Sequence, residues 1–292
     1  MVIDYWDYCM SNGYVILAFN AQEQKAASAC AYSIKIQNPH ASVSMVINSL
    51  NNLLDKYEEP FDNIIELPFD TVEDIRANDW QLNYVTPYDN TIAIDCYSLV
   101  KEKHDELWEY LSNYEMCYSI RTMNFRTVMY DAVPDWYDTY NIKNLSSDLF
   151  YFKKDSEITK QFFLLSEIYM QQWTDSLKEF IEFQYIPTEY DSNLMHAFII
   201  SHLDIYHEVT PHHDTILEII DMNSITKYLK DNDRIEKNWS DYINVWTSTD
   251  TKLKIQNYAI NNTIVYKDKT FITDEIYDEH RKQYAIQTNL VD

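Results

Sequence analysis

The sequence predicts an α/β fold in which helices flank a mostly parallel central sheet. Within residues 14–94, short apolar runs alternate with segments whose apolar residues recur every three to four positions, which is the order strand, helix, strand. The runs are rich in β-branched residues and lack polar alternation, as in strands buried on both faces. Hydrophobic residues make up 46% of the 292-residue chain, enough for a substantial core. We therefore expect right-handed connections between parallel strands.

The expected elements follow from turn and helix signals along the chain. Gly13 opens the first strand, and Pro39, Pro60 and Pro68 bound the next segments, because proline interrupts helices and central strands. We expect strands at 14–19, 41–47, 63–67, 91–94, 115–120 and 149–152, and two short strands within 252–269. We expect helices at 22–37, 50–57, 103–111, 156–183 and 187–207. No change of composition marks a linker, so we expect one domain with a decorated C-terminal half.

The charge and the glycine count exclude several classes of function. The chain carries 47 acidic and 23 basic residues, a net charge of -24, so nucleic-acid backbones and anionic membranes should repel it unless basic residues cluster locally. Gly13 is the single glycine. A glycine-rich phosphate loop, a dinucleotide fingerprint and a Gly-x-Ser-x-Gly nucleophile elbow each need more than one, so none of them is present.

Cysteine usage and hydropathy predict an intracellular protein. The four cysteines (Cys9, Cys30, Cys96 and Cys117) are scattered without a C-x-x-C pair, and no signal peptide begins the chain, so we expect reduced, structural thiols. No apolar run approaches the length that spans a bilayer. We expect no membrane partner and a cytoplasmic location, which is the host cytoplasm if a phage encodes the chain.

Asp95 is the first candidate site residue. It ends the apolar run 91–94 within the stretch TPYDNTIAIDCYSLV, which spans 86–100. Open α/β sheets bind ligands at the carboxyl ends of their strands, where this carboxylate would lie. The alternative is that Asp95 caps a helix, because the polar segment 98–111 that follows has a helical pattern.

Six segments of the chain, taken in order, resemble nucleotide-sugar glycosyltransferases of the GT-A fold, especially the divergent versions of bacteriophages and bacteria. The segments read YVILAFN, AASACAYSIKIQNP, TPYDNTIAIDCYSLV, NLSSDLFYFKK, PTEYDSNLMHAF and KIQNYAINNTIVYKDKTF, and together they run from residue 14 to residue 271. The resemblance implies a single GT-A-like (Rossmann-like) domain over 1–292. Its nucleotide-binding half would cover about 1–120 and its acceptor and sugar half about 121–292.

The resemblance also implies roles for individual residues. The nucleoside would lie against the end of the first strand, and a small polar turn would lie under the donor sugar. The corresponding residues are Ala18, Phe19 and Asn20 for the nucleoside, and Asn144, Ser146 and Ser147 for the sugar. Asp191, with Glu189 nearby, matches the acidic residue that hydrogen-bonds the sugar or assists the acceptor as a base.

The metal motif of the family is incomplete in this chain. The resemblance implies that Asp95 holds a divalent Mn or Mg ion on the donor diphosphate, but Tyr97 occupies the place of the second aspartate. The late lysine that contacts the phosphates is present as Lys269, whereas the histidine ligand expected before it is absent. Three alternatives follow: fewer ligands hold the metal, a cation such as Lys269, Lys267 or Arg76 replaces it, or the chain no longer catalyses.

The leading hypothesis is therefore a hexosyl- or pentosyltransferase that moves a sugar from a nucleotide-diphosphate donor, UDP by resemblance, to a hydroxyl acceptor. The acceptor would be a hydroxymethylated pyrimidine of phage DNA, or alternatively a glycan or protein. For DNA, a local basic cluster would have to contact the phosphates, for instance Lys227, Lys230, Arg234 and Lys237, or alternatively Lys252, Lys254, Lys267 and Lys269. The competing hypothesis is a catalytically degenerate relative that binds a nucleotide-sugar.

The histidines form a further group, because five of the eight lie between His196 and His213. Their spacing does not place two imidazoles on one helical face, which argues against a metal site. The pair His212 and His213 follows Pro211 in an expected loop, which either reaches the cleft or is a solvated turn.

Overall fold

The structure is a computed structural model, and the statements below concern the residues that it describes. These are 11–101, 103, 105–120, 122–124, 136–178, 180–182, 185–187, 190–212, 217–221, 245–247, 253–255, 258–265 and 272–289. Lys269, Lys267, Glu189, His213 and the basic residues between 227 and 237 lie outside the described residues, so their expected roles stay predictions.

A six-stranded mixed sheet forms the centre of the molecule, in the order β3-β2-β1-β4-β8-β6. Four neighbouring strands are parallel: β3 (Asn63–Glu66), β2 (Val43–Ile47), β1 (Asn12–Leu17) and β4 (Asn90–Ile94). Strand β8 (Ser146–Lys153) is antiparallel to β4, and β6 (Met116–Ser119) is antiparallel to β8. The predicted mostly parallel sheet is confirmed.

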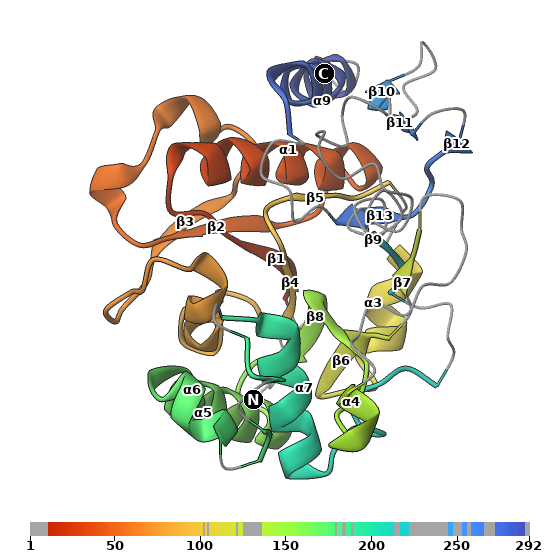
Figure 1. Cartoon of the computed structure of the whole chain (residues 1–292). Helices are drawn as coiled ribbons and strands as arrows, with labels where there is room; N and C mark the ends of the chain where they lie inside the picture. The colour runs from red at the N-terminus through yellow and green to blue at the C-terminus, as the bar shows by residue number, and fades with distance from the viewer. Residues whose placement is uncertain are drawn as a thin grey trace, which may run out of the picture.

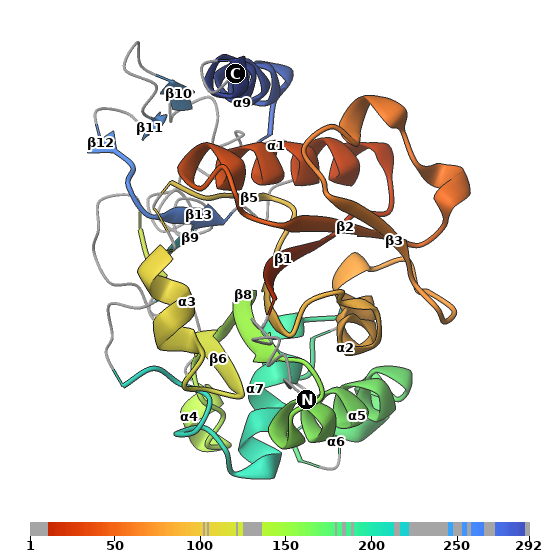
Figure 2. The same cartoon turned by 180° about the vertical axis from the view of Figure 1, so that it is seen from behind.

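Helices cover both faces of this sheet, as Figures 1 and 2 show. On one face lies α1 (Ala21–Gln37), with α9 (Asp274–Asn289) packed beside it. On the other face lie η3 (Ile75–Gln81), α5 (Glu157–Gln171) and α7 (Ser192–Leu203). The shorter helices are α2 (Leu82–Val85), α3 (Asp105–Leu111), α4 (Trp136–Thr139) and α6 (Trp173–Lys178).

Two hydrophobic cores result, one on each face of the sheet. Successive side chains of a strand point to opposite faces. Thus Ile92 and Ile94 of β4 join the core under α1 and α9, whereas Ala93 joins the core under α5 and α7. Because both faces are buried, the strands lack polar alternation, which is the pattern on which the fold prediction rested.

Smaller sheets extend the structure beyond the carboxyl end of β4. A four-stranded sheet has the order β5-β13-β9-β7, and a three-stranded sheet has the order β10-β11-β12. Their strands are β5 (Ser98–Leu99), β7 (Thr122–Met123), β9 (Ile219–Asp221), β10 (Val245–Thr247), β11 (Leu253–Ile255), β12 (Tyr258–Ala259) and β13 (Thr263–Val265).

Several expected elements were wrong in extent. The helix expected at 50–57 is two 3-10 turns, η1 (Leu50–Asn52) and η2 (Asp55–Tyr57). The helix expected at 156–183 ends at Gln171 and resumes as α6, although Phe162 and Leu177 on either side of the break lie in the same core. Of the apolar positions predicted to be core, Ile168 is exposed.

Three further features of the described residues concern a glycine, the cysteines and the helix lengths. Gly13 packs flat against Tyr88, and a Cβ at Gly13 would lie 2.4 Å from that ring. Cys30, Cys96 and Cys117 are free and buried, as expected of structural thiols. None of the described helices has the length and apolar character needed to cross a membrane.

Candidate functional site

Two aspartates meet where β4 and β8 separate. Asp95 directly follows β4, and its backbone N–H donates to the carbonyl of Asp148 on β8 at 2.8 Å. Asp95 lies two positions after Ala93, and Asp148 two positions before Phe150, so both carboxylates point to the face that Ala93 and Phe150 occupy. Like charges opposite one another on neighbouring strands repel, so the pair needs a cation.

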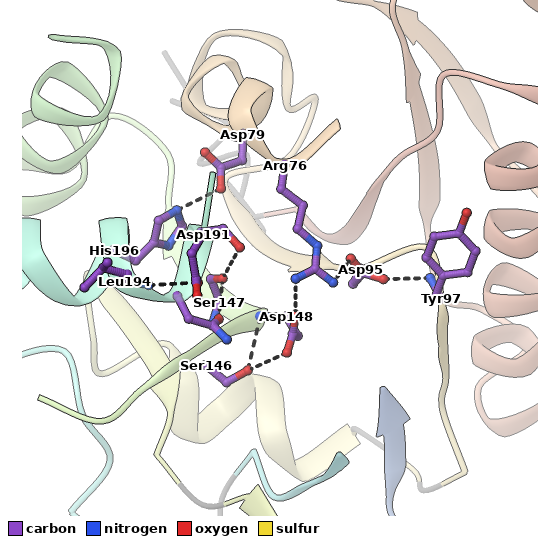
Figure 3. Close-up of polar contacts among 12 residues, drawn as sticks. Arg76, Asp79, Asp95, Tyr97, Ser146, Ser147, Asp148, Asp191, Leu194 and His196 are labelled. Atoms are coloured by element: carbon purple, nitrogen blue, oxygen red, sulfur yellow. Dashed lines mark hydrogen bonds and ion pairs between the residues drawn. The ribbon is translucent and has the colours of Figure 1, made fainter. Parts of the chain in front are cut away.

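Arg76 supplies that cation, as Figure 3 shows. Its Nη2 lies 2.6 Å from a carboxylate oxygen of Asp95 and its Nη1 lies 2.7 Å from a carboxylate oxygen of Asp148, so the arginine forms an ion pair with each aspartate. Asp74 caps the start of η3 by accepting the backbone N–H of Arg76 at 2.9 Å, which fixes where the arginine leaves the chain. The carboxylate side chains are 7% and 4% exposed, whereas the guanidinium side chain is 23% exposed and reaches solvent.

Asp95 does not cap a helix, so that alternative is wrong. Its other carboxylate oxygen accepts the backbone N–H of Tyr97 at 2.8 Å, and the chain continues into β5. The Tyr97 ring is buried, and within the described part of the chain its hydroxyl finds no hydrogen-bond partner. Asp95 therefore ends a strand at the carboxyl edge of the sheet, the predicted position of a ligand-facing residue.

Burial and the neighbouring charges shift the pKa values of Asp95 and Arg76. Burial raises the pKa of the Asp95 carboxyl, and although Arg76 opposes this shift, the nearby Asp148 adds to it. For Arg76, burial acts to lower the pKa, but attraction to Asp95 and Asp148 outweighs burial and raises it. The arginine therefore stays charged, whereas burial favours the protonated form of Asp95.

A second buried cluster stands beside the first. His196 of α7 is fully buried, and its Nε2 lies 2.8 Å from Asp79 of η3. The Nδ1 atom of His196 lies 3.1 Å from the hydroxyl of Tyr118 on β6. With Nε2 donating to the carboxylate, Nδ1 accepts the tyrosine proton, so each group has a partner. This arrangement fixes the Asp79 carboxylate next to Arg76.

A pocket opens over both clusters at the carboxyl ends of β1 and β4. Its polar walls come from η3, β4, β8 and the first turn of α7, and its floor is apolar. It is lined by Val15, Leu17, Ile75, Arg76, Asp79, Leu82, Ala93, Ile94, Asp95, Cys96, Ser147, Phe150 and Ser192. Carboxylates and a guanidinium on an apolar floor suit a ligand with hydroxyl and anionic groups.

The expected sugar turn is strand rather than turn. Ser146 and Ser147 are the first residues of β8, and the hydroxyl of Ser146 donates to Asp148 at 3.0 Å. The hydroxyl of Ser147 lies 2.7 Å from the side-chain oxygen of Asn193 and 2.9 Å from the hydroxyl of Ser192. Ser147 thus reaches the pocket, whereas the half-buried Asn144 does not line it.

Asp191 has a structural role at the start of α7. It is the N-cap of α7 and accepts the backbone N–H of Leu194 at 3.1 Å, and it is not among the residues that line the pocket. Its predicted catalytic role is untested. Asp79, which does line the pocket, comes from a segment that the sequence interpretation left unassigned.

The expected nucleoside residues lie at the end of β1. Ala18 and Phe19 are buried, and Asn20 caps α1 by accepting the backbone N–H groups of Gln22 and Glu23, both at 3.0 Å. Glu23 in turn accepts the N–H groups of Phe19 and Asn20, completing a capping box. Contact of these residues with a nucleoside stays a prediction.

A divalent metal at Asp95, which the resemblance implies, does not fit the residues around it. Hard divalent cations need several oxygen ligands. Both oxygens of Asp95 already accept hydrogen bonds, from Arg76 and from Tyr97. Among the residues that the structure describes, no three His, Cys, Asp or Glu side chains gather closely enough to hold a metal ion.

Sequence reasoning named Arg76, Asp95 and Ser147, and the structure brings all three to one pocket. It missed Asp79, Asp148 and His196 as site residues. The signal for Asp148 was strand alternation, because Asp148 shares a face with Phe150 once β8 is known to begin at Ser146. Asp79 and His196 are 117 residues apart, and no local pattern joins them.

The solved structures with a similar fold include glycosyltransferases. The galactosyltransferase LgtC, solved with donor and acceptor sugar analogues, matches with a TM-score of 0.50 at 10% identity, over 94% of this chain and 95% of its own. GlyE of Streptococcus pneumoniae TIGR4 matches with a TM-score of 0.52 at 10% identity, over 96% of this chain and 63% of its own. No protein-family model and no curated protein sequence matches. At such low identity the likeness shows the fold alone, and this fold is GT-A.

Proposed function

We propose that this chain, which has the GT-A fold, is a glycosyltransferase that moves a sugar from a nucleotide-diphosphate donor to a hydroxyl acceptor. The observation that carries the proposal is the cluster of Arg76, Asp95 and Asp148 in a pocket at the carboxyl end of β4. Ligands of open α/β sheets bind at this edge. The fold alone leaves the function open, since one fold hosts many activities, so the site has to support the proposal.

The chemistry of the pocket matches the needs of sugar transfer. The bond between the anomeric carbon and the diphosphate oxygen breaks, its electron pair leaves with the diphosphate, and an acceptor hydroxyl oxygen bonds to the anomeric carbon while its proton passes to a carboxylate or to the departing phosphate. Arg76 offers N–H donors where negative charge grows on the leaving group. Asp79 and Ser147 offer hydrogen-bond partners for sugar hydroxyls.

UDP is the proposed nucleotide, and the acceptor defines two forms of the proposal. A hydroxymethylated pyrimidine in phage DNA would need basic contacts to offset a net charge of -24, and of the candidate basic residues only Lys254 lies within the described residues. A glycan or protein hydroxyl needs no such contacts. The competing proposal, a degenerate relative that binds a nucleotide-sugar without transferring it, shares the pocket and differs only in turnover.

A binding measurement followed by a transfer assay tests the proposal. We expect UDP or GDP to raise the melting temperature, because a ligand that binds only the folded state stabilises it. Asp95→Ala should weaken that shift, whereas Glu59→Ala, a surface change on the opposite side of the sheet, should retain it. Release of nucleotide from a nucleotide-sugar is then measured with hydroxymethylated DNA and with glycan acceptors. Absence of any shift with either nucleotide would overturn the proposal.

A further inference from the structure

We propose that Arg76 takes the place of the divalent metal in this donor site, so that the site binds a nucleoside diphosphate without a metal ion. The inference rests on the proposed function, because it assumes that the pocket holds a donor. In place of a metal ion, it assigns the charge-stabilising role to a protein cation that is held by Asp95 and Asp148.

The second carboxylate expected of a metal site is missing from this chain. Tyr97 stands where a second aspartate was expected, and only its backbone N–H contacts Asp95. The side chain is buried, and its hydroxyl has no hydrogen-bond partner in the described part of the chain. A tyrosine hydroxyl in that state is neutral, and burial raises its pKa further, so it is a poor ligand for a hard cation.

The carboxylate oxygens of Asp95 and Asp148 already have partners. Arg76 takes one oxygen of Asp95 and one of Asp148, Tyr97 takes the other oxygen of Asp95, and Ser146 takes the other oxygen of Asp148. An entering metal ion would have to displace the guanidinium. That displacement would leave a largely buried cation unpaired, which is strongly unfavourable in folded proteins.

Arg76 remains able to bind an anion. A guanidinium has five N–H donors in a planar fork, and the two ion pairs account for two of them. Its side chain is 23% exposed and lines the pocket, while both aspartates are nearly enclosed. Arginine binds phosphate oxygens through its N–H groups, so a guanidinium that lines the pocket suits a diphosphate.

Calorimetric titration with UDP and GDP, in EDTA and in MnCl2, tests this inference. We expect the wild-type protein to bind one nucleotide in EDTA, with an affinity within about threefold of that in manganese. Arg76→Gln should lose about tenfold or more of that affinity, and Arg76→Lys, which keeps the charge without the fork, should lose part of it. Arg281→Gln removes an equal charge from an exposed ion pair with Glu59 and should bind as wild type does.

A direct manganese titration gives a readout that does not depend on nucleotide. We expect no Mn2+ binding at this site in the wild type and a gain of Mn2+ affinity in Arg76→Gln, because the variant frees two carboxylates. Nucleotide binding that requires manganese in the wild type would overturn the inference and leave the transferase proposal intact. Nucleotide binding in neither condition would overturn the transferase proposal itself. The melting temperature of each variant confirms that it is folded.

Discussion

Arg76 holds together two carboxylates that would otherwise repel across neighbouring strands. Both carboxylates are nearly enclosed, so neither is relieved by water. A buried charge that loses its partner is more costly than a buried pair is valuable. The guanidinium is therefore expected to matter for folding as well as for ligand binding.

Arg76→Met should lower the free energy of unfolding by about 3 kcal/mol at neutral pH, because it leaves Asp95 and Asp148 without a cation. The cost should shrink in acid as one carboxyl takes up a proton. Urea unfolding at pH 7 and pH 5 measures both effects. Adding Asp148→Asn to Arg76→Met should recover part of the loss, and a double variant whose loss equals the sum of the single losses would show that the residues are not coupled.

His196 contacts a residue of the same pocket without lining the pocket itself. It contacts the pocket residue Asp79 with one nitrogen and Tyr118 with the other. Replacing it by leucine keeps the volume but leaves a buried carboxylate and a buried hydroxyl without this partner, which should cost about 1–3 kcal/mol.

The positioning role of His196 predicts a kinetic effect beyond stability. Once a transferase assay exists, His196→Leu should raise the KM for the nucleotide-sugar, since Asp79 loses the group that orients it. Tyr118→Phe removes the hydroxyl that contacts Nδ1 of His196 but keeps the contact between His196 and Asp79, so it serves as the matched control. Equal KM values in wild type and His196→Leu would confine this histidine to a structural role.

The sequence supplied the residues that follow strands and missed those that depend on distant partners. Asp95 was predictable because a short apolar run ends at it, and Ser147 because the resemblance marked its segment. Asp148 was missed because its position depends on where β8 begins, which is set by the backbone bond from Asp95 and the pairing with β4. Asp79 and His196 were missed because only tertiary packing brings η3 and α7 together.

At the scale of elements, β1 packs closely against its neighbours because Gly13 has no side chain. Gly13 lies in β1 between β2 and β4, and its backbone φ is not in the left-handed region, so the glycine is needed for space. The Tyr88 ring fills that space and is fixed by hydrogen bonding between its hydroxyl and Ser44 at 2.7 Å. A ring held at both ends cannot move aside easily.

Gly13→Ala should therefore destabilise the protein by about 1–3 kcal/mol, as overpacked cores do. The added methyl carbon would stand 2.4 Å from the Tyr88 ring. Chemical denaturation gives the loss. In a Tyr88→Leu background the same substitution should cost much less, whereas an unchanged cost would place the strain elsewhere in β1.

At the scale of the whole molecule, a buried contact ties the last described helix to the segment after β5. His280 of α9 is fully buried; its Nδ1 donates to the Ile276 carbonyl at 2.7 Å, and its Nε2 accepts from Lys101 at 2.6 Å. Burial, aided by the Lys101 charge and opposed by the Ile276 bond, lowers the pKa of His280 to about 3. Burial also lowers the pKa of Lys101 to about 8.

This histidine should make the fold sensitive to acid. The folded protein keeps His280 neutral, whereas the unfolded chain protonates it near the ordinary value of 6.5. Its contribution is therefore present above pH 6.5 and is lost as the pH falls from 6.5 towards 3. His280→Gln, whose amide oxygen can still accept from Lys101, should show a smaller fall in melting temperature between pH 7 and pH 5.

The control for this prediction is His207→Gln, a change at an exposed position. It should track the wild type across the same pH range. A His280→Gln protein that loses as much stability as the wild type over that range would contradict the assignment.

Packing of α9 against α1 has a consequence for how the chain folds during synthesis. Lys25 of α1 pairs with Asp274 of α9 across 249 residues, and Tyr32 lies fully buried between Tyr277 and Tyr284. Until the ribosome has made α9, the face of α1 that packs against it lacks this cover. We therefore expect the nascent chain to expose that aromatic surface for most of its translation, when a chaperone can bind it.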